Sequence, residues 1–378
     1  MIPLSVPNLS GNEWKYIKDC LDSNWVSSVG SYVNKFESEI VNYSGAKYAV
    51  ATSNGTAALH ISLILLNIGF NDYVLVPNLT FVAPVNAIKY TGANPILIDV
   101  DPDTWQIDLN LLQTFLERET ENVNHSCVLK ATNRTIKAIM PVHVYGNMCD
   151  MNRLIQMADE YHLEVIEDAT ESLGSKYNGK HAGTFGTLGC LSFNGNKIIT
   201  TGGGGMIITN NKKLAKKAKH ITTQAKSNTL QYIHDETGYN YRLVNILAAM
   251  GVAQLEQLPG FIQKKKEITS LYKKKLTGIE DIQFQQIEKD VEPNFWLTAI
   301  GTSKQKELLT FLNKNNIESK PLWVPMNQLP MFADDSYITN HNVSNELYNS
   351  CVCLPCSTNI VDEDIEFVCQ MILSRYKR

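Results

Sequence analysis

Residues 190–207, CLSFNGNKIITTGGGGMI, place a single lysine, Lys197, between an apolar run and four consecutive glycines. A phosphate-binding P-loop needs G-x-x-x-x-G-K-[ST], and a dinucleotide fingerprint needs G-x-G-x-x-G between a strand and a helix. Neither pattern fits, because Asn196 separates Gly195 from the lysine and a strand-like run, 206–208, follows the glycines. The apolar neighbours predict a buried segment, where an ammonium group is costly unless it has a function. Lys197 is therefore a candidate catalytic residue.

The whole chain has the composition of an ordinary globular protein. Its 378 residues allow one large domain and a smaller one. Hydrophobic residues make up 44% and charged residues 19%, and a net charge of −4 gives no reason to expect nucleic acid as a partner. The longest apolar stretch, 57–70, contains His60 and is too short to span a bilayer. No basic and apolar leader opens the sequence, so we expect a cytoplasmic protein without a membrane partner.

No residue set completes a metal site. Cys351, Cys353 and Cys356 in CVCLPC contain a C-x-x-C half-site, but no second half-site accompanies it. We therefore expect no metal ion, and we interpret these cysteines as small buried hydrophobic residues and the eight scattered cysteines as free thiols. The lysine-rich segment 211–220 has helical spacing and predicts a solvated helix face.

Short β-rich runs alternate with helical patterns over the first two thirds of the chain, which is typical of a wound α/β domain with a mostly parallel sheet. We predict seven strands, at 47–52, 73–77, 95–100, 137–145, 163–168, 188–193 and 205–210. Helical patterns lie between most of them, at 55–67, 82–91, 108–118 and 150–161. A long helix interrupted near Pro259 predicts the domain boundary: a large domain at 14–250, and a smaller α+β domain formed by 251–378 with 1–13.

Ligands of such sheets bind beyond the carboxyl ends of the strands. Three predicted strand ends carry suitable groups: the segment 53–56 (SNGT), Asp168, and Ser192 with Lys197. The first can hold a phosphate at a helix N-terminus, or it can be an ordinary helix cap. A phosphate cup, an acid and a lysine together match the needs of pyridoxal phosphate: an amine for a covalent imine link, and a carboxylate that keeps the pyridine nitrogen protonated.

At this point the chain resembles the DegT/DnrJ/EryC1/StrS sugar aminotransferases, whose fold is the aspartate-aminotransferase-like fold type I. The resemblance rests on the order and spacing of motifs along nearly the whole chain. They include NWVSSVGSYVNKFE, SNGTAAL, VPNLTFVAPVNAI, PVHVYGNMCDM, VIEDATESLGS, SFNGNKIITTGGGGM, GYNYRLVNILAAMGVAQLEQL, KPLWVPM and CLPCS.

The resemblance implies a role for each matching residue. Lys197 would bind the cofactor covalently, Asp168 would pair with the pyridine nitrogen, and Phe81 would stack on the ring. The phosphate would be held by Gly55, Thr56, Ser192 and, from the second subunit of a homodimer, Asn240.

Two positions depart from the family's usual pattern. Glu171 replaces a glutamine that bonds the cofactor's phenolic oxygen, and Asn194 replaces a frequent histidine, which argues against a proton-handling role there. A glutamate beside the phenolate must be protonated, or it must turn toward the sugar and stay ionised. We favour the first, because Glu171 lies one helical step beyond Asp168.

These departures and the insertion 118–135, which can also be an ordinary surface loop, are similar to the legionaminic-acid subgroup. That resemblance implies a UDP- or GDP-linked 4-keto-6-deoxy-N-acetylhexosamine, aminated at C4 by L-glutamate for bacterial surface glycans such as O-antigen. The alternative is a dTDP- or GDP-linked 4-keto-6-deoxyhexose without the N-acetyl group, of the perosamine or viosamine type; a 3-aminotransferase is a further one. Lys197 argues against a dehydratase, and the intact set of Asp168, Ser192 and Lys197 argues against a regulator with a degenerate cofactor pocket. The candidate sugar-nucleotide contacts are Trp25, Ser27, Lys320 and Trp323.

Overall fold

The computed structural model describes residues 1–228 and 230–376. Its α-helices are α1 (Glu13–Asp22), α2 (Ser31–Ser44), α3 (Gly55–Leu65), α4 (Ala83–Tyr90), α5 (Leu109–Glu119), α6 (Met151–Glu160), α7 (Lys212–Thr222), α8 (Asn245–Leu276), α9 (Gln305–Lys314), α10 (Val343–Ser350) and α11 (Asp362–Leu373). The strands of the main sheet are β1 (Tyr48–Thr52), β2 (Tyr73–Pro77), β3 (Asn94–Ile98), β4 (Thr120–Val123), β5 (Ser126–Leu129), β6 (Arg134–Ile139), β7 (Glu164–Asp168), β10 (Leu188–Ser192), β11 (Gly205–Thr209) and β17 (Ser336–Ile338). Smaller sheets contain β8 (Lys176–Tyr177), β9 (Lys180–His181), β12 (Lys226–Asn228), β13 (Ile233–His234), β14 (Gln283–Phe284), β15 (Val291–Glu292), β16 (Thr298–Gly301) and β18 (Cys351–Leu354).

The main sheet has ten strands and the order β1-β11-β10-β7-β6-β2-β3-β17, with β4 and β5 attached beside β6. Neighbours from β10 to β17 along this order are parallel, and β11 runs opposite to both β1 and β10. All seven predicted strands are present, and the predicted wound α/β class with a mainly parallel sheet is confirmed.

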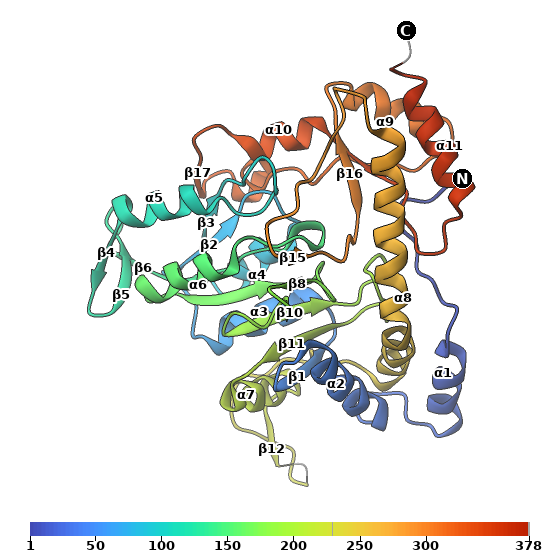
Figure 1. The fold of residues 1–378 in the computed structure, drawn as a ribbon. Coiled ribbons are helices and arrows are strands. Elements are labelled where there is room, and N and C mark those ends of the chain that lie inside the picture. The colour runs from blue at the N-terminus through green and yellow to red at the C-terminus, as the bar shows by residue number, and fades with distance from the viewer. Residues whose placement is uncertain (229, 377–378) are drawn as a thin grey trace.

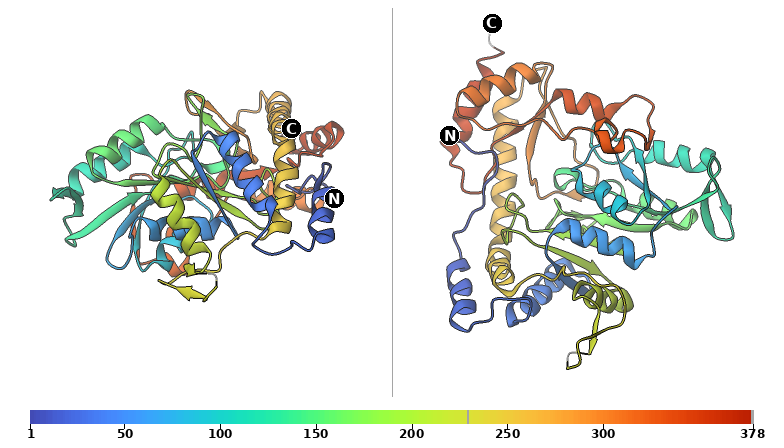
Figure 2. Two further views of the ribbon diagram at one scale, coloured as in Figure 1. Left: turned by 90° about the horizontal axis from the view of Figure 1, so that it is seen from below. Right: turned by 180° about the vertical axis from the view of Figure 1, so that it is seen from behind.

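Helices cover both faces of this sheet (Figures 1 and 2). Side chains alternate along each strand, so that in β2 Leu75 joins one apolar cluster while Val74 and Val76 join the other. One cluster includes α2, α5, α6 and the first half of α8, and the other includes α3, α4 and α7. Burial on both faces explains why these strands read as short, continuous apolar runs.

The C-terminal part forms a third apolar cluster around the three-stranded sheet β14-β16-β18, packed by α9, α11 and the second half of α8. The N-terminal segment runs beside α8 to this part (Figure 1), where Ile2 bridges to Ile317. Helix α8 continues through Pro259 and crosses the predicted boundary at 250/251, so the helix links the two regions and is not interrupted. The division into two domains remains a proposal.

Two strand groups of the main sheet were not predicted, nor were the strands of the smaller sheets. Residues 336–338 form β17, a parallel edge strand beside β3. The insertion 118–135 folds as the antiparallel strands β4 and β5, which extend β6. The predicted strand 137–145 ends early, at Ile139, and the chain then turns through a 3-10 segment, Val144–Gly146.

Other expectations concern the surface and the thiols. All eight cysteines are free and buried, as the cysteine interpretation requires. The basic segment forms α7, whose lysines are solvent-exposed as predicted. Within the described ranges, no helix combines the length and apolar character needed to cross a bilayer.

Candidate active site

The carboxyl ends of β1, β7 and β10 meet at one edge of the sheet and surround a cavity of about 300 Å³. Eight of the predicted site residues line it: Gly55, Thr56, Phe81, Glu171, Ser192, Asn194, Lys197 and Trp323. Asp168 ends β7, is 2% exposed and is coupled electrostatically to Lys197. The structure therefore brings the predicted lysine, acid and phosphate-binding groups together.

The N-terminus of α3 forms a cup for an anion. Asn54 caps the helix, because its side chain accepts a hydrogen bond from Ala57 N at 2.7 Å. The cap leaves the amides of Gly55 and Thr56 without a helical acceptor, as at any helix start, and their partial positive charge favours a phosphate. Added to Gly55, a Cβ atom would lie 2.9 Å from the Cβ of Ser192, so the glycine keeps the cup open beside the serine hydroxyl.

The glycine run brings β11 against this cup. Gly205 pairs with Thr52, and a Cβ atom on Gly205 would lie 2.4 Å from the carbonyl oxygen of Asn54. Gly202 has φ +80°, a left-handed conformation that suits glycine. These glycines thus allow the close approach of β11 to the start of α3.

Lys197 lies in the turn that follows β10. The turn is tied by a hydrogen bond from Lys197 N to Asn194 O at 3.0 Å. The Nζ atom is 3.5 Å from Glu171 Oε1 and 4.0 Å from the centroid of the Trp296 ring. The lysine is thus placed between a carboxylate and an aromatic face inside the cavity.

Asp168 is a buried carboxylate with little local compensation. Among the described residues, only Thr170 hydrogen-bonds to it, through its N–H to Oδ1 at 3.1 Å. Burial raises the pKa of Asp168, while Thr170 and the charge of Lys197 act against that rise. A cationic partner such as a protonated pyridine nitrogen would keep this carboxylate ionised, so the donor set fits pyridoxal phosphate.

Glu171 lines the cavity, but it lies in a turn, so the expectation that it follows Asp168 by one helical step is wrong. Its Oε2 accepts a hydrogen bond from Tyr145 N at 3.0 Å. Tyr145 adopts φ 60°, uncommon for a bulky residue, and this conformation directs its N–H at the carboxylate. Burial raises the pKa of Glu171 to about 7, although Lys197 and the Tyr145 amide act to lower it. Both protonation states are therefore accessible near neutral pH.

Besides the buried Asp168, four predicted site residues lie outside the cavity lining. Trp25 and Ser27 are exposed, and their carbonyls bind Asn245 at the start of α8. Lys320 points to Glu318, with 2.9 Å between Nζ and Oε1. Asn240 is exposed and does not line the cavity of its own chain. Their proposed roles remain predictions.

Beyond the eight predicted residues, six others line the cavity: Asn54, Leu59, Ala83, Thr170, Asn196 and Trp296. Asn54 belongs to the segment 53–56 already singled out, and the next four lie in the same sequence motifs as predicted site residues. Trp296 comes from the segment NFWLT in the C-terminal part, about a hundred residues from Lys197, and no periodic pattern marks it.

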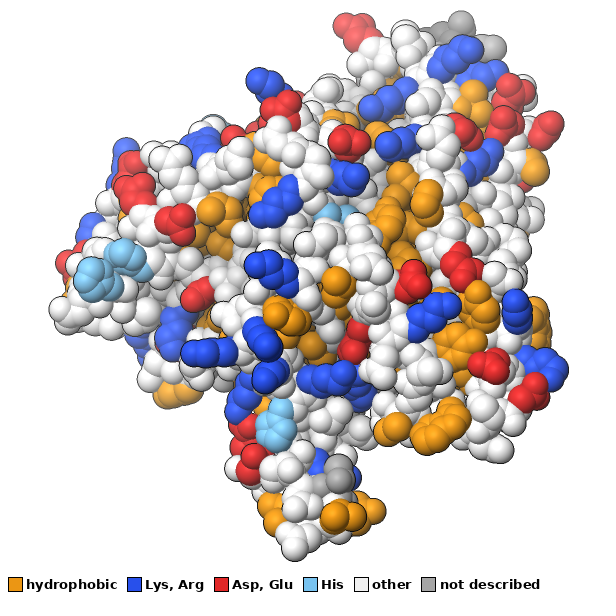
Figure 3. Space-filling model, turned by 60° about the horizontal axis from the view of Figure 1, so that its bottom comes forward, with side chains coloured by type: hydrophobic (Ala, Val, Ile, Leu, Met, Phe, Trp, Pro, Cys, Tyr) orange, Lys and Arg blue, Asp and Glu red, His pale blue; other side chains and the backbone are white. Residues whose placement is uncertain are grey.

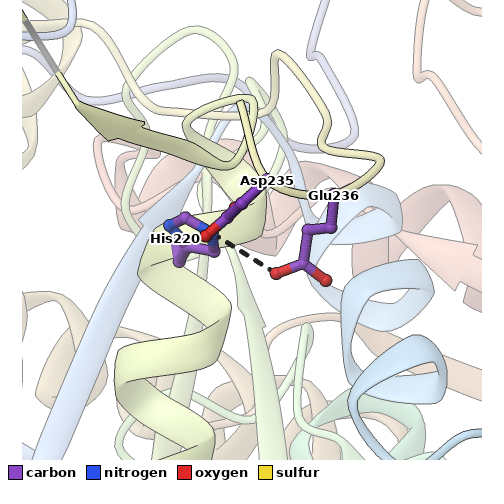
Figure 4. A group of neighbouring side chains, drawn as sticks. All are labelled: His220, Asp235 and Glu236. Carbon is purple, nitrogen blue, oxygen red and sulfur yellow. Dashed lines mark hydrogen bonds and ion pairs between the residues drawn. The ribbon is translucent and has the colours of Figure 1, made fainter. Parts of the chain in front are cut away.

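A second group of polar residues lies apart from this cavity. His220, Asp235 and Glu236 bring three possible metal ligands within 4.8 Å of one another (Figure 4). His220 Nε2 contacts Asp235 Oδ1 at 2.7 Å, and Lys217 binds the carboxylate of Glu236. The charges of this group are matched within the protein, and we propose no metal ion there. The group ties the β12–β13 hairpin to α7.

Comparison with known proteins identifies one family. Residues 7–373 match the DegT/DnrJ/EryC1/StrS aminotransferase family. The chain is similar to GDP-perosamine synthase of Escherichia coli O157:H7, with 41% identity over 99% of this chain and 98% of that protein. It is also similar to GDP-perosamine synthase of Vibrio cholerae, with 37% identity over 98% of both chains. A crystal structure of a DegT DnrJ EryC1 StrS aminotransferase from Brucella abortus superposes with a TM-score of 0.90 at 25% identity, covering 97% of this chain and 96% of that one.

Proposed function

Because the chain belongs to the DegT/DnrJ/EryC1/StrS aminotransferase family, we propose that it transfers an amino group from L-glutamate to C4 of a GDP-linked 4-keto-6-deoxyhexose without an acetamido group. The family match confirms the predicted family. Membership of that family confirms two further predictions: the enzyme class of sugar aminotransferase and pyridoxal phosphate as cofactor. The nucleotide, the sugar, the amino donor and the oligomeric state belong to the proposal.

The observation that carries the choice of substrate is the 41% identity, over nearly the full length of both chains, to a protein named GDP-perosamine synthase. The similar Vibrio cholerae protein bears the same name. These relatives favour the perosamine-type alternative over the N-acetylhexosamine of the legionaminic-acid subgroup, which was our first expectation. The product would be a 4-amino-4,6-dideoxy sugar for a surface polysaccharide.

Each residue at the cavity would have a separate role in amino-group transfer. When bound, pyridoxal phosphate supplies an electron sink for negative charge at the carbon that gains or loses nitrogen. The amides of Gly55 and Thr56 and the hydroxyl of Ser192 would hold its phosphate. Asp168 would keep the pyridine nitrogen protonated, and Lys197 Nζ would move the proton at the reacting carbon. Phe81 and Trp323, on the cavity wall, would exclude water from the ring and the sugar.

The projecting hairpin supports the proposed homodimer. Strands β12 and β13 extend away from the body of the molecule (Figures 1 and 3). Near its tip Leu230 is 90% exposed and Tyr232 72% exposed, which is costly unless a partner covers them. Asn240 follows the hairpin and is exposed in its own subunit. An arm that crosses to a second copy would bring Asn240 to the partner's phosphate cup.

The test is product formation with a panel of sugars. Purified protein with pyridoxal phosphate and L-glutamate is incubated with GDP-, UDP- and dTDP-linked 4-keto-6-deoxy sugars, with and without an acetamido group. We expect an amino sugar, detected by mass spectrometry, from the GDP-linked sugar without the acetamido group. Preference for an acetamido sugar would overturn the proposed substrate.

The covalent role of Lys197 is tested in the same preparation. Borohydride reduction followed by peptide mapping should place the cofactor on Lys197, and Lys197→Ala should form no amino sugar. Cofactor attached to any other lysine would refute the assignment of the site.

A further inference from the structure

Lys197 is enclosed on two sides by groups that suit an ammonium ion. Glu171 Oε1 lies 3.5 Å from its Nζ, and the centroid of the Trp296 ring lies 4.0 Å from the same atom. The face of an indole ring attracts a cation electrostatically, most strongly when water is excluded. Trp296 is 3% exposed. The pair therefore has the geometry of a favourable resting position for the free amine.

Every polar group of Trp296, in the backbone and in the indole ring, makes a hydrogen bond. Its backbone N–H donates to Asn294 Oδ1 at 2.9 Å, and its carbonyl accepts from Lys265 Nζ at 2.8 Å. The indole N–H donates to the carbonyl of Asn196 at 2.7 Å, in the turn that carries the lysine. Because the backbone N–H, the backbone carbonyl and the indole N–H of Trp296 are all hydrogen-bonded, the ring cannot rotate without breaking a buried hydrogen bond.

Asn294 connects the two groups that contact the lysine. Its side-chain N–H₂ donates to the carbonyls of Glu171, at 2.9 Å, and Leu173, at 3.0 Å. Its Oδ1 binds the N–H of Trp296. Asn294 is completely buried, and a Cβ atom on Gly146 would lie 1.8 Å from its Oδ1, so a glycine is required beside it. One amide thus sets the spacing between the Glu171 turn and the Trp296 backbone.

Lys265 is a buried ammonium without a carboxylate partner among the described residues. It is 2% exposed, and its Nζ donates to the carbonyls of Trp296 and Cys356, at 2.8 and 2.6 Å, and to Cys356 Sγ at 3.5 Å. Burying an ion that lacks a counter-ion costs several kcal/mol, which an apolar side chain would avoid. The hydrogen bonds to the Trp296 and Cys356 carbonyls are what the ammonium gains at this position.

We propose that Asn294 and Lys265 are positioning residues that hold the Trp296 indole over Lys197, so that the amine rests between Trp296 and Glu171 whenever it is not joined to the cofactor. The lysine stem is flexible, and this arrangement keeps its Nζ within reach of the reacting carbon. The inference rests on the proposed function, in which Lys197 is released and used again in every turnover.

The direct test is the ring-current shift of the lysine. The full-length protein, freed of cofactor, is reductively methylated with ¹³C-formaldehyde, which keeps the positive charge of each amine. The methyl resonance of Lys197 is identified by its absence in Lys197→Arg. We expect it upfield of the exposed lysines, because it lies over an aromatic face. The upfield displacement should vanish in Trp296→Leu and shrink in Asn294→Ala and in Lys265→Met.

Two matched variants serve as controls. Lys264→Met removes the neighbouring, more exposed lysine, which pairs with Asp362. Trp105→Leu removes another buried tryptophan that, like Trp296, packs edge-on against Tyr145. Neither should move the Lys197 resonance. A wild-type resonance at the position of exposed lysines would overturn the proposal, as would a displacement that survives in Lys265→Met and Asn294→Ala, or one that the controls change equally. If Asn294→Ala does not fold, Lys265→Met decides.

Kinetics give a second, independent result. Asn294 and Lys265 do not line the cavity, so their replacement should lower kcat by about ten- to a hundred-fold through misplacement of the amine, with the KM for the sugar unchanged. The spectrum requires neither cofactor nor sugar. Absence of amino-sugar formation would therefore count against the proposed function alone, whereas an unshifted resonance in an active enzyme would count against the positioning role alone.

Discussion

Glu171 Oε1 and Lys197 Nζ lie 3.5 Å apart inside the cavity, yet burial keeps the pKa of the glutamate at about 7. A lysine beside a carboxylate ordinarily lowers its pKa. Here the loss of hydration is the larger effect, so Glu171 can exchange a proton near neutral pH. This proton exchange at Glu171 leads to the first prediction.

Glu171→Gln should flatten the pH dependence of stability in the cofactor-free protein. The folded pKa, about 7, lies above the unfolded value of 4.5. The folded state therefore binds more protons, and the stability that Glu171 contributes is fully present below pH about 4.5 and is lost as pH rises through about 7. The loss amounts to ~3 kcal/mol at most. Urea unfolding between pH about 5 and 8 measures it, with the exposed Glu280→Gln as control. Equal slopes for wild type and Glu171→Gln would refute the shifted pKa.

Asp168→Asn should lower kcat by at least about 10²-fold, because the neutral amide cannot hold a proton on the pyridine nitrogen. A cofactor analogue methylated at that nitrogen carries a permanent positive charge and should restore part of the rate in Asp168→Asn alone. Thr170→Val, which keeps the backbone N–H that binds Asp168, is the milder comparison. Near-normal turnover of Asp168→Asn with the natural cofactor would show that the role is misassigned.

Asn240 is predicted to serve the partner's cofactor. Asn240→Ala should weaken cofactor retention by about 1.5–3 kcal/mol, the value of one hydrogen bond to a charged group, and leave the dimer intact. Mixing Asn240→Ala with Lys197→Ala at limiting cofactor distinguishes an Asn240 that serves the partner's site from one that serves the site of its own subunit. If the asparagine acts across the interface, mixed dimers regain one complete site and activity rises above that of either parent. If activity does not rise on subunit exchange, or if the protein is monomeric, the intersubunit role is wrong.

Gly205→Ala should destabilise the fold and loosen the phosphate cup. The added Cβ would lie 2.4 Å from the Asn54 carbonyl oxygen and 2.7 Å from Gly55 N, both backbone atoms that cannot rotate away. We expect a loss of about 1–3 kcal/mol in the free energy of unfolding, with weaker cofactor binding. Gly260→Ala, within α8 and with no atom within 4 Å, should instead be neutral or stabilise by about 0.5–1 kcal/mol. Similar unfolding curves for the two variants would contradict the close approach of β11.

The seven predicted strands were predictable because burial makes each one a compact apolar run, as in YVLVP at 73–77. Strand β17 has only three residues, SYI, none of which is buried, so it carries no such signal. The apolar run PVHVY, 141–145, led to the opposite error, because it was predicted to continue a strand. Its burial comes from packing around the Tyr145 turn and not from a place in the sheet.

The site was predictable where its residues end strands. Ser192, Asp168 and Gly55 come together because carboxyl ends of neighbouring strands share an edge of the sheet. Trp296 reaches the same cavity from the C-terminal part, and Asn294 reaches the backbone of the Glu171 turn beside it; this long-range packing leaves no spacing rule in the sequence. The exposure of Asn240 could not be predicted from the sequence either, because it depends on where the β12–β13 hairpin projects from the rest of the protein.

Strand β17 also has a consequence for the way the chain is made. It covers the edge of β3, and Thr339 just beyond it binds Asp99, 240 residues earlier in the chain. At a synthesis rate of about 5–20 residues per second, the β3 edge emerges from the ribosome roughly 12–48 s before the strand that covers it. During that interval the nascent sheet has an open edge that can pair with a neighbouring chain. Production of this protein should therefore depend on chaperones or slow growth, and a chain truncated before Ser336 should aggregate even though every residue of the cavity has already been made.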